Sequence, residues 1–215
     1  MNIINAPNNI NFNGTWRGAI TVQKKSYLYF TRNNGKAGKF HFVGYRPKTV
    51  NVVEIDKDDS EDMWALKKMI ALWGKKSIVQ DLFNSYSGIE EDSIFVFTTQ
   101  KNKYDKLRSK NILGYLQVQD TTNYDSVDID VLQTKPSLKY KNLFKKIPFL
   151  NRAVQYLRKY HDVGKGMLKY TEDELCSGRK IDLYSLSGAI PFYEKYGLKH
   201  TDSNDTRVMS LERRG

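Results

Sequence analysis

The chain of 215 residues has little of the chemistry that builds disulfide frameworks or metal centres. It contains one cysteine, Cys176, and a single cysteine excludes both an internal disulfide and a zinc site made of thiolates. Its three histidines, His41, His161 and His200, are widely separated, which argues against a site of several imidazole ligands. We therefore expect no metal.

Long apolar runs are also missing. No stretch approaches the roughly 20 apolar residues that span a bilayer. Residues 1–13 are rich in Asn and lack the basic-then-apolar order of a secretion signal. We expect a soluble, cytoplasmic protein with no membrane partner.

Positive charge is abundant: 35 Lys and Arg oppose 24 Asp and Glu, for a net charge of +11. Hydrophobic residues make up 40% of the chain and aromatics 13%, which is enough to bury a core. The length suits one large domain with a modest extension.

The order of the expected elements predicts the fold class. Residues 13–48 have β-forming runs separated by turns and predict a β-meander of about three short strands, closed by Arg46–Lys48. We therefore place an N-terminal β extension at 1–48 and a main domain at 49–215. The main domain is expected to have strands at 50–55, 93–99, 111–120, 126–134, 180–186 and 207–211, and helices at about 60–73, 77–86, 149–160, 164–175 and 188–196. This order predicts an α+β fold, a mixed and mostly antiparallel sheet with helices on both faces.

The segment His161–Met167 (HDVGKGM) is the first with a chemical implication. Gly164 and Gly166 open a helix whose following residues are apolar. Glycines allow close approach of a bulky anion, and a helix start presents unpaired N–H groups with partial positive charge. A pyrophosphate site fits this pattern, and so does a loop-to-helix junction with glycines for tight packing.

The segment Ala189–Leu198 (AIPFYEKYGL) follows a predicted strand. Together with the glycine segment and with Asp128–Pro136 (DIDVLQTKP), it resembles the GNAT superfamily of acyl-CoA-dependent N-acetyltransferases. That family has a Q/R-x-x-G-x-G/A pyrophosphate loop after its fourth strand and an A-x-x-F-Y-E-K-x-G-F/L motif on its last helix. The resemblance covers about residues 50–211 and implies a GNAT-like fold.

The resemblance also implies acetyl transfer from acetyl-CoA to a primary amine by direct attack in a ternary complex. The family's fourth and fifth strands diverge, and the pantetheine arm lies between them. Tyr193 is then the acid that protonates the departing thiolate, since a phenol is protonated at neutral pH. The implied cofactor-binding residues are Leu132, Gln133, Thr134, His161, Asp162, Val163, Gly164, Lys165, Gly166, Met167 and Ser187.

A base for the acceptor amine is less clearly marked. Asp128 and Asp130 are two apart on a strand and share a face, and Asp128 matches the family's frequent acidic position. Both also fit ordinary surface carboxylates. Two positions depart from the family pattern: His161 replaces Gln or Arg, and Leu186 stands where many relatives have Asn.

Residues 131–161 carry eight Lys or Arg and no acidic residue. We interpret 137–160 as a basic insertion. It fits a flap that holds the 3′-phosphate of CoA, a lid over the acceptor, or a surface for RNA or DNA across 135–159. The alternative functions are thus a nucleic-acid-binding protein on a GNAT scaffold, or an inactive interaction module. A monomer and a homodimer both remain open.

Overall fold

The computed structural model describes residues 14–31, 39–74, 92–102, 105–119, 125–136 and 159–212, and for 26–31 and 39–43 it describes the backbone alone. The predicted helices at 77–86 and 149–160 and most of the basic insertion lie outside these ranges. Within them, no helix is long and apolar enough to cross a membrane.

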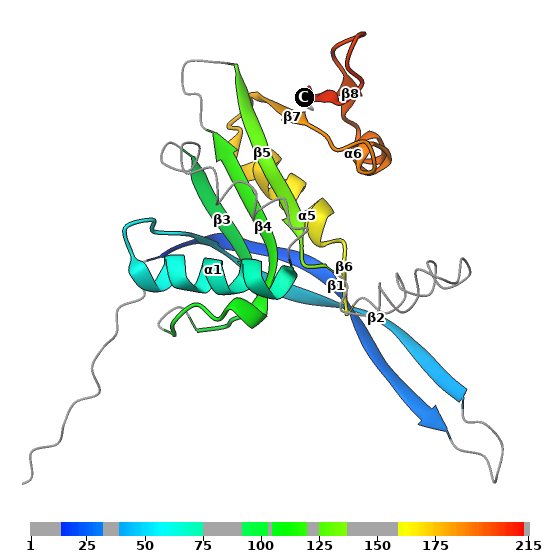
Figure 1. Cartoon of the computed structure of the whole chain (residues 1–215). Helices are drawn as coiled ribbons and strands as arrows, with labels where there is room; N and C mark the ends of the chain where they lie inside the picture. Colours follow the sequence, from blue (N-terminus) through cyan, green and yellow to red (C-terminus); the bar gives the residue numbers. More distant parts are fainter. Residues whose placement is uncertain are drawn as a thin grey trace, which may run out of the picture.

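One mixed sheet of nine strands organises the described chain, in the order β6-β1-β2-β3-β4-β5-β7-β9-β8 (Figure 1). Its neighbours pair antiparallel except for β5 and β7, which pair in parallel. The strands are β1 Thr15–Thr31, β2 Lys39–Glu54, β3 Ser93–Thr98, β4 Ile112–Gln119, β5 Ser126–Thr134, β6 Tyr160–His161, β7 Lys180–Tyr184, β8 Lys199–His200 and β9 Val208–Leu211.

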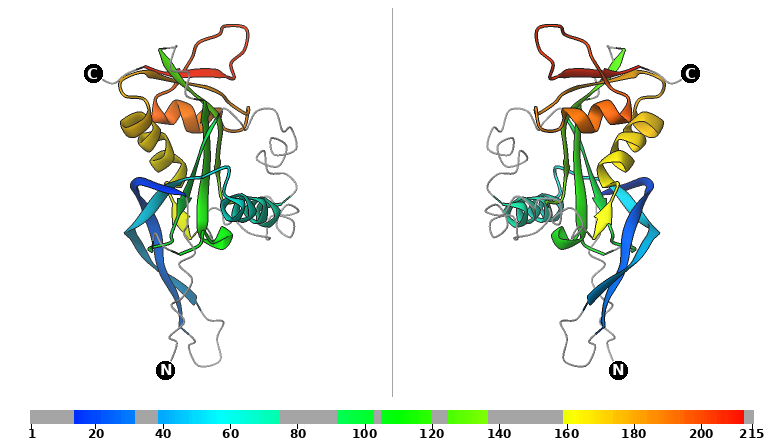
Figure 2. Two further views of the ribbon diagram at one scale, coloured as in Figure 1. Left: turned by 90° about the vertical axis from the view of Figure 1, so that its left-hand side faces the viewer. Right: turned by 90° about the vertical axis from the view of Figure 1, so that its right-hand side faces the viewer.

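Helices cover both faces of this sheet (Figure 2). α1 (Ser60–Trp73) lies on one face, and α5 (Val163–Tyr170) and α6 (Ile190–Tyr196) lie on the other. The described residues also include two short helical segments, η2 (Ser109–Asn111) and the π-helical η3 (Thr171–Leu175). The predicted GNAT-like α+β class, a mostly antiparallel mixed sheet between helices, is confirmed.

The N-terminal region differs from the predicted meander. In place of three short strands it forms two long ones, β1 and β2, which pair from Thr15–Glu54 to Thr31–Lys39. Pro47 does not end the strand, because β2 meets its second neighbour β3 only from Asn51 onward. Near Pro47 the strand is therefore an edge, where a missing N–H is tolerated. The expected domain boundary at 48 falls inside β2.

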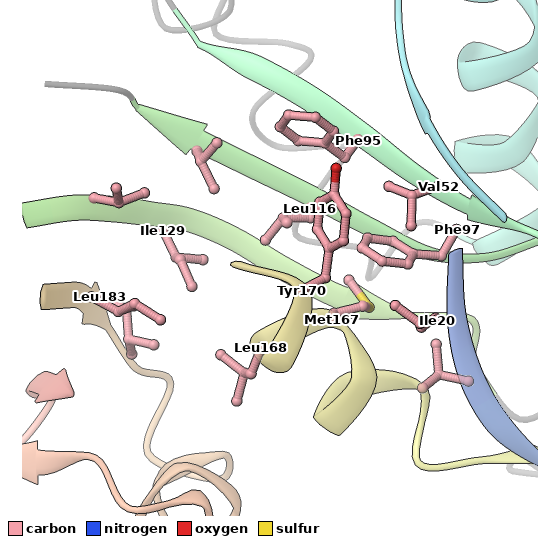
Figure 3. Packing of buried hydrophobic residues seen from close by; sticks show 14 of the residues in the cluster. Ile20, Val52, Phe95, Phe97, Leu116, Ile129, Met167, Leu168, Tyr170 and Leu183 are labelled. Carbon is pink, nitrogen blue, oxygen red and sulfur yellow. The ribbon is translucent and has the colours of Figure 1, made fainter. Parts of the chain in front are cut away.

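The two faces of the sheet bury separate hydrophobic cores. The α5-side core contains Ile20, Phe97, Leu116, Met167 and Leu168, among others, and is drawn in Figure 3. The α1-side core gathers buried side chains of the helix and of the opposite strand faces, including Leu66, Met69, Val96, Tyr115 and Val131. Alternation along the strands produces this division, since successive side chains point to opposite faces.

Gly114 on β4 is required by close packing of α5 on the sheet. A Cβ at this position would lie 2.5 Å from Sδ of Met167 and 3.4 Å from Cβ of Phe97, and both of these side chains are fully buried. Gly114→Ala is expected to lower the free energy of unfolding by about 1–3 kcal/mol through overpacking, as measured by urea denaturation.

Gly188→Ala is the matched control, because a Cβ there would meet nothing within 4 Å. It should change stability by no more than about 0.5 kcal/mol. Equal stability of Gly114→Ala and the wild type would show that α5 does not pack this closely on β4.

Candidate active site

Strands β5 and β7 separate partway along their length. Their parallel pairing runs from Ser126–Lys180 to Ile129–Leu183, whereas β5 continues to Thr134. Over Asp130–Thr134, no described strand pairs with β5 on the side of β7. A strand-like ligand added on that side would lie alongside the backbone of this segment.

A β-bulge at Asp130 lies where the two strands part. On β4, Val118 pairs with Ile129 and Gln117 pairs with Val131, so Asp130 is the extra residue. A bulge bends its strand and increases the local twist. It also changes which face the chain presents: Ile129 belongs to the α5-side core and Val131 to the α1-side core.

Helix α5 begins beside the part of β5 that continues past β7. Asp162, at its N-cap, has a left-handed backbone with φ 62°. A Cβ on Gly164 would lie 3.5 Å from Cγ2 of Thr134 and 3.1 Å from Cζ of Phe192. Gly164 thus brings the first turn of α5 close to both β5 and α6. The first N–H groups of a helix lack intrahelical acceptors and attract anions.

Gly166 has a packing role that the sequence left open. A Cβ there would lie 2.7 Å from Cδ1 of Ile20 on β1. Tight packing therefore accounts for Gly166. The pyrophosphate interpretation of Gly164, which lies close to Thr134 and Phe192, stays a prediction.

Tyr193 on α6 is 7% exposed and packs in the α5-side core. Burial raises the pKa of its phenol to about 12, so the hydroxyl is protonated at neutral pH. No hydrogen bond joins this hydroxyl to another described residue. The neighbouring Phe192 is 38% exposed, because the short helix α6 turns Tyr193 inward and Phe192 outward.

Asp128 and Asp130 lie close together, as their spacing predicts. Asp128 accepts a hydrogen bond from Ser126 Oγ at 3.3 Å. Asp130 is exposed as a whole residue, but its carboxyl group lies against Asp92. Desolvation, followed by the charge of Asp92 and a hydrogen bond to it, raises the pKa of Asp130 to about 7.

Asp92 is a functional candidate that the sequence did not reveal. It is 5% exposed and accepts a 2.5 Å hydrogen bond from Gln117 Nε2, while the Tyr115 hydroxyl donates to Gln117 Oε1 at 2.7 Å. Its contact with Asp130 depends on the bulge. Asp92 directly precedes β3 and Asp130 lies on β5, so no local sequence pattern predicts that the two residues are neighbours.

The other predicted residues lie at the end of β5, in the turn into α5 and in the β7–α6 loop, and their roles stay predictions. Leu132, Gln133 and Thr134 are half-buried, and Asp162, Lys165 and Ser187 are exposed. Val163 and Met167 bury their side chains in the α5-side core, so only their amides could meet a ligand. His161 is part of β6, where its ring contacts Tyr45.

Cys176, possible metal ligands and the basic segment bear on the other functions that the sequence suggested. Cys176 is 2% exposed within the α5-side core, as expected of a packed thiol. In the part of the chain that the structure covers, no three His, Cys, Asp or Glu side chains group as metal ligands. Most of the basic segment behind the nucleic-acid alternative lies outside this part, so that alternative stays untested.

No family model and no curated protein sequence matches the chain. Among solved structures, it is similar to the PaiA N-acetyltransferase of Thermoplasma acidophilum in complex with coenzyme A, at 14% identity over 77% of this chain and 99% of that one, with a TM-score of 0.44. It is also similar to the Escherichia coli ribosomal-protein-S18-alanine N-acetyltransferase, at 16% identity over 77% and 96% of the two chains, with a TM-score of 0.43. A Pseudomonas aeruginosa acyl-CoA N-acyltransferase matches at 12% identity over 77% and 99%, also at 0.43. The assignment of a GNAT-like fold rests on the chain's own strand order and on the divergence of β5 from β7.

Proposed function

We propose that the protein is an acyl-CoA-dependent N-acyltransferase that moves an acetyl group from acetyl-CoA to a primary amine. The observation that carries this proposal is that β5 continues to Thr134, past its last pair with β7 at Ile129, beside the first turn of α5. A gap lined by strand backbone and a helix start suits a ligand that joins an amide-rich arm to a diphosphate.

The proposed positions of the co-substrate follow the groove. The pantetheine arm would pair with backbone groups of Leu132, Gln133 and Thr134. The diphosphate would accept hydrogen bonds from amides of the first turn of α5, up to Lys165, because the Gly166 N–H already donates to the Asp162 carbonyl at 2.8 Å. This turn lies in the predicted segment from His161 to Met167. The segment between His161 and Met167 consists of Asp162, Val163, Gly164, Lys165 and Gly166. Exposed Ser187 is the proposed contact from the β7–α6 loop.

The chemistry is a direct displacement at the thioester carbonyl. The amine nitrogen forms the new N–C bond, the carbonyl oxygen takes negative charge that a β5 amide stabilises, and the C–S bond then breaks. The thiolate takes its proton from Tyr193, which regains one from solvent. The ammonium proton of the acceptor passes to the Asp128–Asp130 carboxylates, directly or through water.

The pKa of Asp130 predicts how turnover depends on pH. A base must be deprotonated to accept a proton, so kcat/KM should rise about tenfold per pH unit below 7 and level off above it. The rise follows from the raised pKa of Asp130, about 7. Asp130→Asn should lower kcat and remove this inflection from the pH profile.

Asp182→Asn is the matched control, since Asp182 lies opposite Asp128 in the β5–β7 ladder and pairs with Lys180. Its pH profile should keep the inflection near 7. A wild-type profile without an inflection between pH 6 and 8 would contradict the role of Asp130.

A screen of amines tests the proposed function. Purified protein is incubated with acetyl-CoA and pools of small amines, peptides with free N-termini and lysine peptides, and released thiol is measured. The proposal predicts thiol release that depends on one pool and an acceptor that gains one acetyl group in mass. Failure of the protein to bind CoA in calorimetry would contradict it.

A further inference from the structure

The N-terminal hairpin β1–β2 is packed against the beginning of α5. Figure 1 shows the hairpin extending away from the body of the sheet, with β6 beside its base. The backbone of β6 pairs with β1 at Gln23–His161 and Lys24–Tyr160, and Lys25 N–H donates to the Lys159 carbonyl at 2.9 Å. The residues that lead into α5 are thus hydrogen-bonded to the hairpin.

Side chains of the hairpin make two further contacts with the same turn. The ring of Tyr45, which lies opposite Lys25 in the hairpin, meets the His161 ring edge-to-face at 4.9 Å and 74°. Ile20 fills the space that Gly166 leaves. In Figure 3 the Ile20 side chain reaches from β1 toward Met167 on α5.

The turn between His161 and Gly166 is therefore held from two sides. Ile20 and Tyr45 contact it from the hairpin. On the other side, Thr134 of β5 and Phe192 of α6 lie close to Gly164. A shift of the hairpin would therefore move the backbone amides of this turn. Amides displaced from their hydrogen-bonding positions would bind an anion less tightly.

We propose that the N-terminal hairpin forms the outer wall of the co-substrate site, with Ile20 and Tyr45 as positioning residues for the α5 turn. This inference rests on the proposed function. Both residues act through the turn, on the affinity for the diphosphate part of acyl-CoA. They leave the chemical step to β5 and α6.

Tyr45→Ala is the primary test, because the side chain is 44% exposed and its loss opens no core cavity. The loss of one aromatic pair should raise the Kd for CoA and the KM for acetyl-CoA by about three- to tenfold. The kcat at saturating acetyl-CoA should stay within about twofold, since uniform binding alone is lost. Ile20→Ala should act in the same direction, and Tyr45→Phe and Ile20→Val should restore wild-type values.

Amide hydrogen exchange separates this inference from the proposed function. Exchange over residues 160–168 should accelerate in Tyr45→Ala whether or not CoA is present, and Thr21→Ala, an exposed neighbour of Ile20, should leave it unchanged. Unchanged exchange and unchanged Kd in Tyr45→Ala would overturn the inference. If the wild type binds no CoA and exchange is still faster in Tyr45→Ala, the hairpin does hold the turn in place. That result would contradict the proposed function.

Discussion

Tyr193→Phe is expected to lower kcat by about a hundredfold, the usual contribution of a positioned general acid, while the Kd for CoA stays unchanged. The substitution removes one hydroxyl whose pKa burial raises to about 12. That hydroxyl bonds to no other described residue, so its loss should not disturb the fold. Steady-state kinetics and calorimetry with CoA measure the two quantities.

Tyr170→Phe is the matched control for this prediction. Tyr170 is also buried in the α5-side core, and burial likewise raises its pKa to about 12. Its ring packs edge-on against Phe95 and Phe97, away from the end of β5, so kcat should stay within about twofold. A kcat for Tyr193→Phe equal to that of Tyr170→Phe would remove Tyr193 as the acid.

Gly164→Glu is expected to raise the Kd for CoA more than about a hundredfold. The added side chain would start 3.1 Å from Phe192 and 3.5 Å from Thr134 and would occupy the gap between α5 and β5. Its charge would also repel the diphosphate, by about 4 kcal/mol for unit charges 4 Å apart near a protein surface. Calorimetric titration with CoA measures the loss.

Two control variants test whether the loss of binding comes from unfolding or from added charge alone. Leu72→Glu adds the same charge to an exposed position on α1, on the opposite face of the sheet, and should bind CoA like the wild type. Gly164→Ala adds the contacts with Phe192 and Thr134 without the charge and should weaken binding far less. A folded Gly164→Glu protein with wild-type affinity would place the phosphates elsewhere.

Local patterns predicted most of the main domain. Apolar residues at helical spacing and an acidic first turn marked α1, which begins after its N-cap at Asp59. The runs at 93–99, 111–120 and 126–134 became β3, β4 and β5 within one residue at each end. These elements depend on the spacing of apolar residues within each segment, which can be read from the sequence alone.

Features that depend on distant partners could not be predicted in this way. The long hairpin exists because β1 and β2 pair with each other beyond the body of the sheet, so Pro47 lies in an edge segment. The bulge at Asp130 needs the register of β4 against β5, and only that register brings Asp92 to Asp130. The packing role of Gly166 likewise requires Ile20, which lies on the first strand of the sheet.

A crystal structure of the protein with CoA is the most direct test of the account. We expect the diphosphate on the amides of residues 163–165 and the pantetheine arm alongside Leu132–Thr134, with its sulfur near the Tyr193 hydroxyl. CoA bound at any other surface would contradict this mechanism.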